Sequence, residues 1–440
     1  MEHLIAGSTP SFRSELDIFS VKPTDVSVQS SDFQQYYPLT SVKENENPLE
    51  FYVPGDNTHY LDLYSSYLYI QAKILKQNGA DLAETELCAP GQLFFASMFQ
   101  NCSVSLNGTN VFDSSNFYPY HGWIQRQLSC GESQKKTELT SEMYYKDTAP
   151  NTYTLAGNSG FKARFELSKK SKTFELIGRP YVNIFQQKRY IPNNVDMTLA
   201  FRRSSPKFSL SSATTSETGV TGSPFKWKIE NAVLYIRKHV LHPELTLYTD
   251  QHFSRGQNAM YPINRVEVKS IAIPKSSLGT SGDVIFNGPL PHVLTMGLVS
   301  SKAFSGELDH SPFNFQHFKI KEIVVSVDGD SSVYRALNFN FEAGEYLNGY
   351  NTLFKALPYH GNGNFIQRED YETGGNVLAV FDIQPTAGPG RFQLPRSGRV
   401  KVEVRFKEAL SDPVNLIVYG QFQSLIQIDR NRNVYVDTHG

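Results

Sequence analysis

Apolar and polar residues alternate over many short stretches of the chain, which is the pattern of half-buried β-strands. In residues 195–203, Val195, Met197, Leu199 and Phe201 fall on one face, and most of the residues between them are polar. Comparable patterns predict further strands at residues 51–53, 67–75, 225–230, 265–273, 318–327, 398–407 and 414–428. The sequence therefore predicts an all-β protein.

Two nearly identical pentapeptides, VSLNG at 104–108 and VSVDG at 325–329, each end such a strand. Their last two residues tolerate a positive φ, as a tight hairpin turn requires. The predicted turn residues are Asn107, Gly108, Asp328 and Gly329. The repetition predicts that one strand-to-hairpin unit occurs twice in the chain, at the same position of two similar domains.

Helical patterns are scarce, and the three best ones have a regular placement. Residues 119–128 and 345–357 follow the two predicted hairpins, and residues 243–253, with Pro243 in the first turn, lie between the two halves. Many strands with few helices favour two antiparallel sandwiches over a parallel sheet, and a sandwich with an inserted helix is a common form of jelly roll.

The predicted organisation is an arm followed by two tandem jelly rolls. Residues 1–45 show little periodicity and are interpreted as an extended N-terminal arm. The first jelly roll is assigned to residues 46–242, and the second, with a charged C-terminal tail, to residues 243–440. The Ser/Thr/Gly-rich stretch 204–225 is interpreted as a long surface loop rather than as an interdomain linker.

Composition narrows the possible partners. With 42 Lys and Arg against 43 Asp and Glu, the net charge is -1, so we expect no sequence-specific binding of nucleic acid. Cys88, Cys102 and Cys130 cannot all pair and show no CxxC spacing, which suits a reducing compartment. The first ten residues lack the pattern of a secretory signal, so we expect a chain that is not secreted. The 13% of aromatic residues suits large sheet cores and broad protein interfaces.

Catalytic chemistry has little support in the sequence, because no motif for a nucleophile, a zinc protease or a phosphate loop is present. His239 and His242 are placed at the end of a strand, where a spacing of three points side chains to opposite faces. Carboxylates that could serve glycoside hydrolysis are Glu369, Asp370, Asp382 and Glu403, although Glu403 alternates with Lys401 and Arg405 as on a solvated face. We therefore expect no enzyme, no cofactor and no metal site.

Long segments of the chain, in order and nearly from end to end, resemble the major capsid protein of Maverick/Polinton-type elements and adintovirus-like viruses. Among them are FELIGRPYVNIFQQKRYIPNNVDMTLAF, REDYETGGNVLAVFDIQP and NLIVYGQFQSLIQIDRNRNV. The resemblance also covers residues 14–31, 48–74, 104–108, 228–241, 261–274 and 311–320. Residues 131–160 and 204–225 fall outside it.

The resemblance implies a double jelly-roll fold, with two eight-stranded sandwiches in tandem. It further implies a homotrimer that forms a pseudo-hexagonal capsomer and assembles into an icosahedral shell around a DNA genome. Expected partners are neighbouring capsid trimers and a penton or minor capsid protein, while a membrane partner stays open. The expected location is the virion, with synthesis and assembly inside the host cell, in the nucleus. No catalytic or metal-binding position is carried over.

Two questions stay open at this point. Asp429, Arg430, Asn431 and Arg432 could pair across a subunit interface or form a solvated tail. A two-domain β-sandwich enzyme acting on carbohydrate, or a tandem carbohydrate-binding module, is the alternative to the capsid protein.

Overall fold

The computed structural model describes the chain in ten stretches, residues 16, 18–19, 24–42, 48–214, 223–280, 282–328, 336–355, 363–383, 394 and 396–437. Gly329 of the second predicted turn lies outside the described residues, as does most of the segment before residue 24.

The first half of the chain folds into two four-stranded antiparallel sheets that face each other. Sheet 1 has the order β1 (Val28–Tyr36), β10 (Phe225–Leu241), β3 (His59–Lys76) and β7 (Phe174–Gly178). Sheet 2 has the order β2 (Leu49–Val53), β8 (Met197–Arg203), β5 (Phe99–Leu106) and β6 (Thr109–Asp113). Alternate residues of each strand point between the sheets, so Leu68, Ile70, Leu199 and Phe201 are fully buried.

The second half repeats this arrangement. Sheet 3 has the order β11 (Ala259–Ile273), β18 (Val414–Ile428), β13 (Val293–Ser300) and β16 (Leu378–Asp382), with β19 (Val434–Asp437) also paired to β18. Sheet 4 has the order β12 (Asp283–Pro289), β17 (Ser397–Phe406), β14 (Ile320–Val327) and β15 (Leu337–Asn338). In both halves the strands, counted along the sandwich, follow the orders 1-8-3-6 and 2-7-4-5. The predicted fold class, two tandem eight-stranded jelly rolls, is therefore confirmed.

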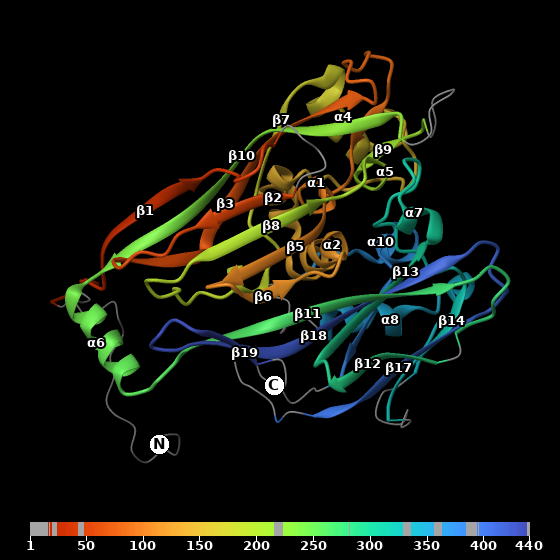
Figure 1. Ribbon diagram of the computed structural model, residues 1–440. Coiled ribbons are helices and arrows are strands. Elements are labelled where there is room, and N and C mark those ends of the chain that lie inside the picture. The colour runs from red at the N-terminus through yellow and green to blue at the C-terminus, as the bar shows by residue number, and fades with distance from the viewer. Residues whose placement is uncertain are drawn as a thin grey trace.

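Helices are few and connect the strands. The three predicted helices are present as α2 (Tyr118–Ser129), α6 (Pro243–Ser254) and α8 (Leu347–Lys355). α2 and α8 each follow the fifth strand of their sandwich, and α6 connects the two sandwiches (Figure 1). The other α-helices of the described residues are α1 (Phe94–Ser97), α3 (Glu132–Lys136), α4 (Ser159–Ser168), α5 (Pro206–Ser209), α7 (Ser301–Ser305) and α10 (Arg368–Glu372).

Three predicted irregular segments contain regular structure. β1 lies in the predicted arm, and its polar residues give no alternation because most of them are exposed at a sheet edge. β19 lies in the predicted tail. It was not predicted because four residues are too few to show an alternating pattern. α5 and β9 (Leu210–Ser212) lie in the predicted surface loop, where β9 is buried and pairs with β4 (Cys88–Pro90). The part of that loop at residues 215–222 is outside the described residues.

The four sheets form successive layers, from sheet 1 at one side of the molecule to sheet 4 at the other (Figure 1). One continuous cluster of buried apolar side chains extends through both sandwiches. The predicted boundary at residue 242 falls between β10 and α6. None of the helices in the described part of the chain is long and apolar enough to cross a membrane.

Candidate functional site: the seam between the two sandwiches

The two sandwiches meet along a buried surface, called the seam below, where α2 packs against the second sandwich. Trp123 of α2 is 2% exposed, and its ring stacks on Phe313 at 5.6 Å and on Phe315 at 5.0 Å between ring centres. Tyr120, one helix turn earlier, stacks on Phe304 at 6.1 Å. Because aromatic side chains bury large areas, these contacts join the two sandwiches through a hydrophobic core.

His121 extends this core to the strands of both sandwiches. Its ring centre lies 5.7 Å from that of Phe112 in β6 and 5.9 Å from that of Tyr419 in β18. The imidazole is almost completely buried, and burial lowers its pKa to about 3 because the charged form loses its hydration. His121 therefore acts as a neutral aromatic residue in the seam at physiological pH.

Acid is expected to weaken the seam through His121. An unfolded histidine binds a proton near pH 6.5 but the folded His121 only near pH 3, so the unfolded state holds more protons in between. The free energy of unfolding should therefore fall, by up to about 1.4 kcal/mol per pH unit, as the pH drops through this window. Urea unfolding of His121→Gln at pH 4 to 6 should show this slope removed.

His292 provides the comparison for this experiment. Burial lowers its pKa to about 4, so His292→Gln should remove the same slope over a narrower range of pH. An unchanged slope in His121→Gln would contradict the assignment of the acid sensitivity to this side chain.

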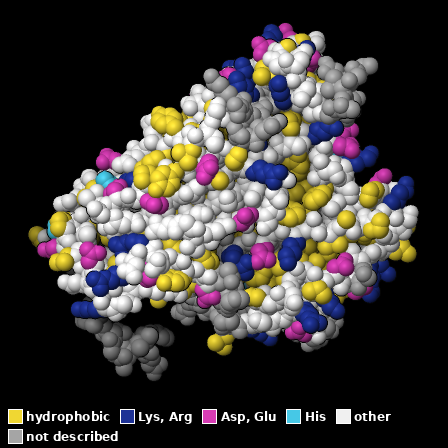
Figure 2. All heavy atoms as spheres, in the orientation of Figure 1, with side chains coloured by type: hydrophobic (Ala, Val, Ile, Leu, Met, Phe, Trp, Pro, Cys, Tyr) yellow, Lys and Arg dark blue, Asp and Glu magenta, His cyan; other side chains and the backbone are white. Residues whose placement is uncertain are grey.

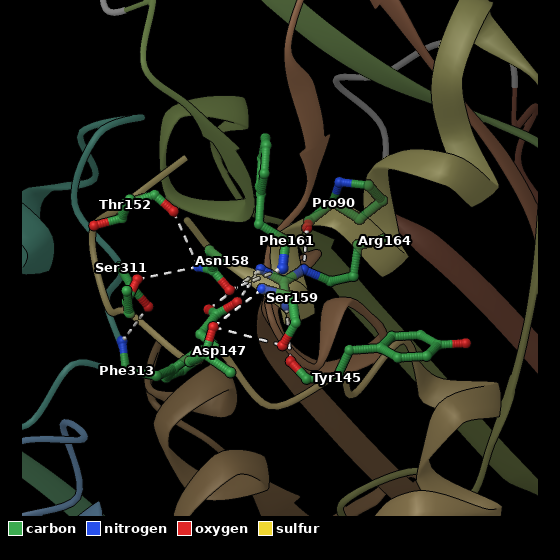
Figure 3. A network of polar contacts seen from close by, with 12 residues as sticks. Pro90, Tyr145, Asp147, Thr152, Asn158, Ser159, Phe161, Arg164, Ser311 and Phe313 are labelled. Carbon is green, nitrogen blue, oxygen red and sulfur yellow. Dashed lines mark hydrogen bonds and ion pairs between the residues drawn. The ribbon is translucent and has the colours of Figure 1, made fainter. Parts of the chain in front are cut away.

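A polar network beside the aromatic contacts orders the segment that follows α3. Arg164 of α4 is fully buried and donates from Nε to the Pro90 carbonyl oxygen (2.9 Å) and from Nη1 to the Tyr145 carbonyl oxygen (2.8 Å). Its Nη2 pairs with both carboxylate oxygens of Asp147, at 2.9 and 3.2 Å. Figure 3 shows Arg164 between these partners, with its guanidinium directed at Asp147. The charge is thus buried but completely paired.

The ordered segment then reaches the second sandwich. Asn158 caps α4 by accepting from the Phe161 N–H (3.2 Å) and holds the Thr152 carbonyl through Nδ2 (3.0 Å) (Figure 3). Asn151 of this segment accepts from the Ser311 N–H (2.8 Å). Residues 131–160, which lie outside the sequence resemblance, therefore contribute directly to the seam.

An ion pair also crosses this part of the seam. Lys146 Nζ lies 2.6 Å from Oδ1 of Asp370, which is mostly buried on α10 of the second sandwich. Because the lysine side chain is 43% exposed, this pair contributes orientation more than stability.

The turn between β18 and β19 makes a second connection, at the far end of the seam. Arg432 donates from Nε to the Asn193 carbonyl oxygen (2.8 Å) and from Nη2 to Asn193 Oδ1 (2.6 Å). Asn107 Nδ2 donates to the Arg432 carbonyl oxygen (2.8 Å). The Arg432 guanidinium also lies 4.5 Å from the ring centre of Phe253 in α6. Two of the predicted residues, 325 positions apart, are thus in contact.

The other predicted residues have turn or surface positions. Asp429 accepts from the Asn433 N–H (2.9 Å) and closes the β18–β19 turn, in which Arg430 and Asn431 are exposed. Nothing in the sequence indicated that this turn would contact residues 107 and 193, because the interaction depends on how the sandwiches pack.

The two predicted hairpin turns follow strands in equivalent places. Asn107 and Gly108 have φ of 46° and 77° between β5 and β6. Asp328, with φ of 53°, follows β14. β5 and β14 are both the fourth strand of their sandwich. Superposition of Asn107 on Asp328 stays a prediction that this strand order supports.

The groups considered for catalysis are separated or paired. His239 Nε2 lies 3.3 Å from Asp62 in the strand interior, whereas His242 accepts the Glu244 N–H at the start of α6. Glu403 pairs with Arg405 (2.8 Å), as the alternating pattern predicted. Glu369 and Asp370 lie on α10, and Asp382 ends β16.

Among the described residues, one group of side chains has the spacing of possible metal ligands, and one groove is present. Glu307, Asp309 and His310 offer ligand atoms within 4.8 Å of one another, all on one half-buried loop. A groove of about 490 Å³ lies between β6 and β11. Arg265 and Glu267, two of its charged residues, form an ion pair with each other. No set of groups converges there as a reaction site would require.

Comparison with known proteins gives a consistent picture of the fold. No family model matches the chain. An uncharacterized protein of Caenorhabditis elegans is 23% identical over 412 residues, which cover 91% of this chain and 96% of that protein. This relative gives no indication of function.

Solved structures from viruses match nearly the whole chain at low sequence identity. A chain of the Sputnik virophage has a TM-score of 0.60 at 10% identity and covers 98% of this chain and 93% of its own. The Faustovirus major capsid protein has a TM-score of 0.58 at 10% identity, with 95% and 92% covered. The mavirus major capsid protein has a TM-score of 0.55 at 10% identity, with 99% and 96% covered. The chain therefore has the double jelly-roll fold that these viral major capsid proteins share.

Proposed function

We propose that this chain is a major capsid protein, a structural subunit without enzymatic activity. The observation that carries the proposal is the exact repetition of strand order in two sandwiches that a continuous hydrophobic seam joins into one block. A shell subunit needs a rigid shape and extensive contact surfaces, whereas an enzyme needs a convergent set of reactive groups. The fold, shared over nearly the full length with viral major capsid proteins, supports the same proposal.

The duplication has a geometric use in a shell. Three copies with two similar sandwiches each present six similar units around one axis, so a homotrimer can occupy a hexagonal lattice position. We infer that the chain trimerises in this way and that the trimers contact one another, and a penton or minor capsid protein, in an icosahedral shell around a DNA genome.

The sequence resemblance supports a finer assignment. We infer that the chain comes from a Maverick/Polinton-type element or an adintovirus-like virus, that it assembles in the nucleus of the host cell and that it resides in the virion. The near-neutral net charge of -1 agrees with a shell that encloses DNA without binding a specific sequence.

Native mass and electron microscopy test the proposal together. Three copies of a 49.6 kDa chain should give a species of about 150 kDa by light scattering. Negative-stain images should show capsomers with six-fold appearance and, at high protein concentration, closed shells. A protein that stays monomeric under all assembly conditions and binds or cleaves oligosaccharides would overturn the capsid assignment in favour of a carbohydrate-active protein.

A further inference from the structure

A small cavity lies in the seam, between α2 of the first sandwich and two loops of the second. Its lining includes Trp123 of α2, Asn314 of the loop between α7 and β14, and Asn376 of the loop between α10 and β16. It offers about 20 Å³ to the centre of a water-sized molecule. About 10–15 Å³ of such space is needed to hold one water molecule, so the cavity has room for water but not for an organic ligand.

Three polar atoms of these lining residues are buried without a hydrogen-bond partner in the part of the chain that the structure describes. They are Trp123 Nε1, Asn314 Oδ1 and Asn376 Oδ1. Trp123 is 2% exposed and Asn314 is 6% exposed. The Asn376 amide has a defined orientation, because its Nδ2 donates to the Gly374 carbonyl oxygen (3.0 Å) and leaves Oδ1 as the free acceptor. Since buried polar groups are nearly always hydrogen-bonded, these atoms indicate a bound ligand.

The charged residues of the lining are paired, so the ligand is expected to be neutral. Asp370 Oδ1 lies 2.6 Å from Lys146 Nζ, and Asp147 pairs with Arg164 at 2.9 Å (Figure 3). A divalent cation would need several oxygen ligands, with carboxylates among them. On the face seen in Figure 2, Lys and Arg side chains are interspersed with Asp and Glu, so no extended field of one sign attracts an ion.

Water matches the three atoms in number and kind. One is an N–H donor and two are oxygen acceptors, whereas a water molecule donates two hydrogen bonds and accepts others. Buried waters typically make about three hydrogen bonds. Gly375 also lines the cavity, and a Cβ at this position would lie 2.5 Å from Asn314 Oδ1. A glycine here therefore leaves that oxygen uncovered.

We propose that the seam binds one structural water molecule, which accepts a hydrogen bond from Trp123 Nε1 and donates to Asn314 Oδ1 and Asn376 Oδ1. The water joins α2 of the first sandwich to two loops of the second. It therefore adds a polar bridge to the aromatic contacts of Trp123 with Phe313 and Phe315. The site belongs to a single chain, so it can be tested independently of the proposed trimer.

A structure of the purified chain at about 1.8 Å resolution tests the site directly. We expect one density peak within about 2.6–3.2 Å of all three atoms. The same peak should appear when the protein is prepared in a buffer free of sodium, potassium and divalent cations, because water needs no ion to bind.

A double-mutant cycle tests whether the two sandwiches share this water. Trp123→Phe removes the N–H but keeps a ring, and Asn376→Leu removes one acceptor. Each should raise the unfolding equilibrium constant. In the double variant this constant should be at least about fivefold smaller than the product of the two effects, because either change alone already weakens the shared water. Trp227→Phe, in the core of the first sandwich, is the matched control and should multiply with Asn376→Leu within about twofold.

Three results would overturn the proposal. A well-ordered seam without a density peak at this position means that the cavity is dry. A peak that disappears in the cation-free buffer means that the site holds an ion. Effects of Trp123→Phe and Asn376→Leu that simply multiply mean that no ligand connects the two side chains.

Discussion

Replacing Trp123 by alanine is expected to separate the unfolding of the two sandwiches. Trp123 fills the centre of the seam, between the rings of Phe313 and Phe315, and is 2% exposed. Removing a buried tryptophan side chain costs about 3–5 kcal/mol, because the transfer energy is lost and a cavity is left. Since this loss falls on the contact between sandwiches, scanning calorimetry should show one transition for the wild type and two for Trp123→Ala.

The only other tryptophan provides a matched control. Trp227 is 3% exposed in the core of the first sandwich, and its indole N–H donates to Ser209 Oγ (2.8 Å). Trp227→Ala should cost a similar free energy and lower the transition temperature without dividing the transition. If both variants show two calorimetric transitions, or if both show one, the seam is not the element that couples the two sandwiches.

Replacing Arg164 by methionine is the second large effect that we expect. Methionine fills much of the volume but leaves the Asp147 carboxylate, whose side chain is 8% exposed, without its partner. Breaking a buried ion pair from one side typically costs about 3–5 kcal/mol. Amide hydrogen exchange should accelerate in residues 145–159, because the carbonyl oxygen of Tyr145 and the Asp147 side chain are no longer held.

A second substitution separates charge from packing in this experiment. Asp147→Asn added to Arg164→Met removes the unpaired charge, so the double variant should regain part of the lost stability. Lys162→Ala, at an exposed position on the same helix, should change the free energy of unfolding by less than about 0.5 kcal/mol. A double variant no more stable than Arg164→Met would show that packing, and not the unpaired carboxylate, dominates.

The extent to which the fold was predictable follows from how each strand is buried. β18 was predicted from Val414 to Ile428, as the structure has it, and β17 and β8 were found because their residues alternate between a buried face and a more exposed one. β13 was not predicted, because sheet 3 is covered on both faces and VLTMGLVS therefore shows no alternation. β1 was missed for the opposite reason, since most of its residues are exposed.

The candidate site was predictable only in part. Asn107, Asp328 and Arg432 were singled out from turn chemistry and from charge. The contact of Arg432 with Asn107 and Asn193 depends on the packing of two domains, which no local pattern records. The same holds for Arg164, a mid-helix arginine that has no sequence signature of complete burial.

The order of synthesis gives the contact between Asn107 and Arg432 a further consequence. All eight strands of the first sandwich are complete once residue 241 has been made, but Arg432 follows Asn107 by 325 residues. At roughly 5–20 residues per second, translation separates the two by about 15–65 s. Within this interval, once residue 241 has been made, the nascent chain carries a complete first jelly roll whose seam side, with Tyr120 and Trp123, lacks its cover until residues 304–315 follow. We therefore expect ribosome-bound chains of this length to expose aromatic side chains that the folded protein buries.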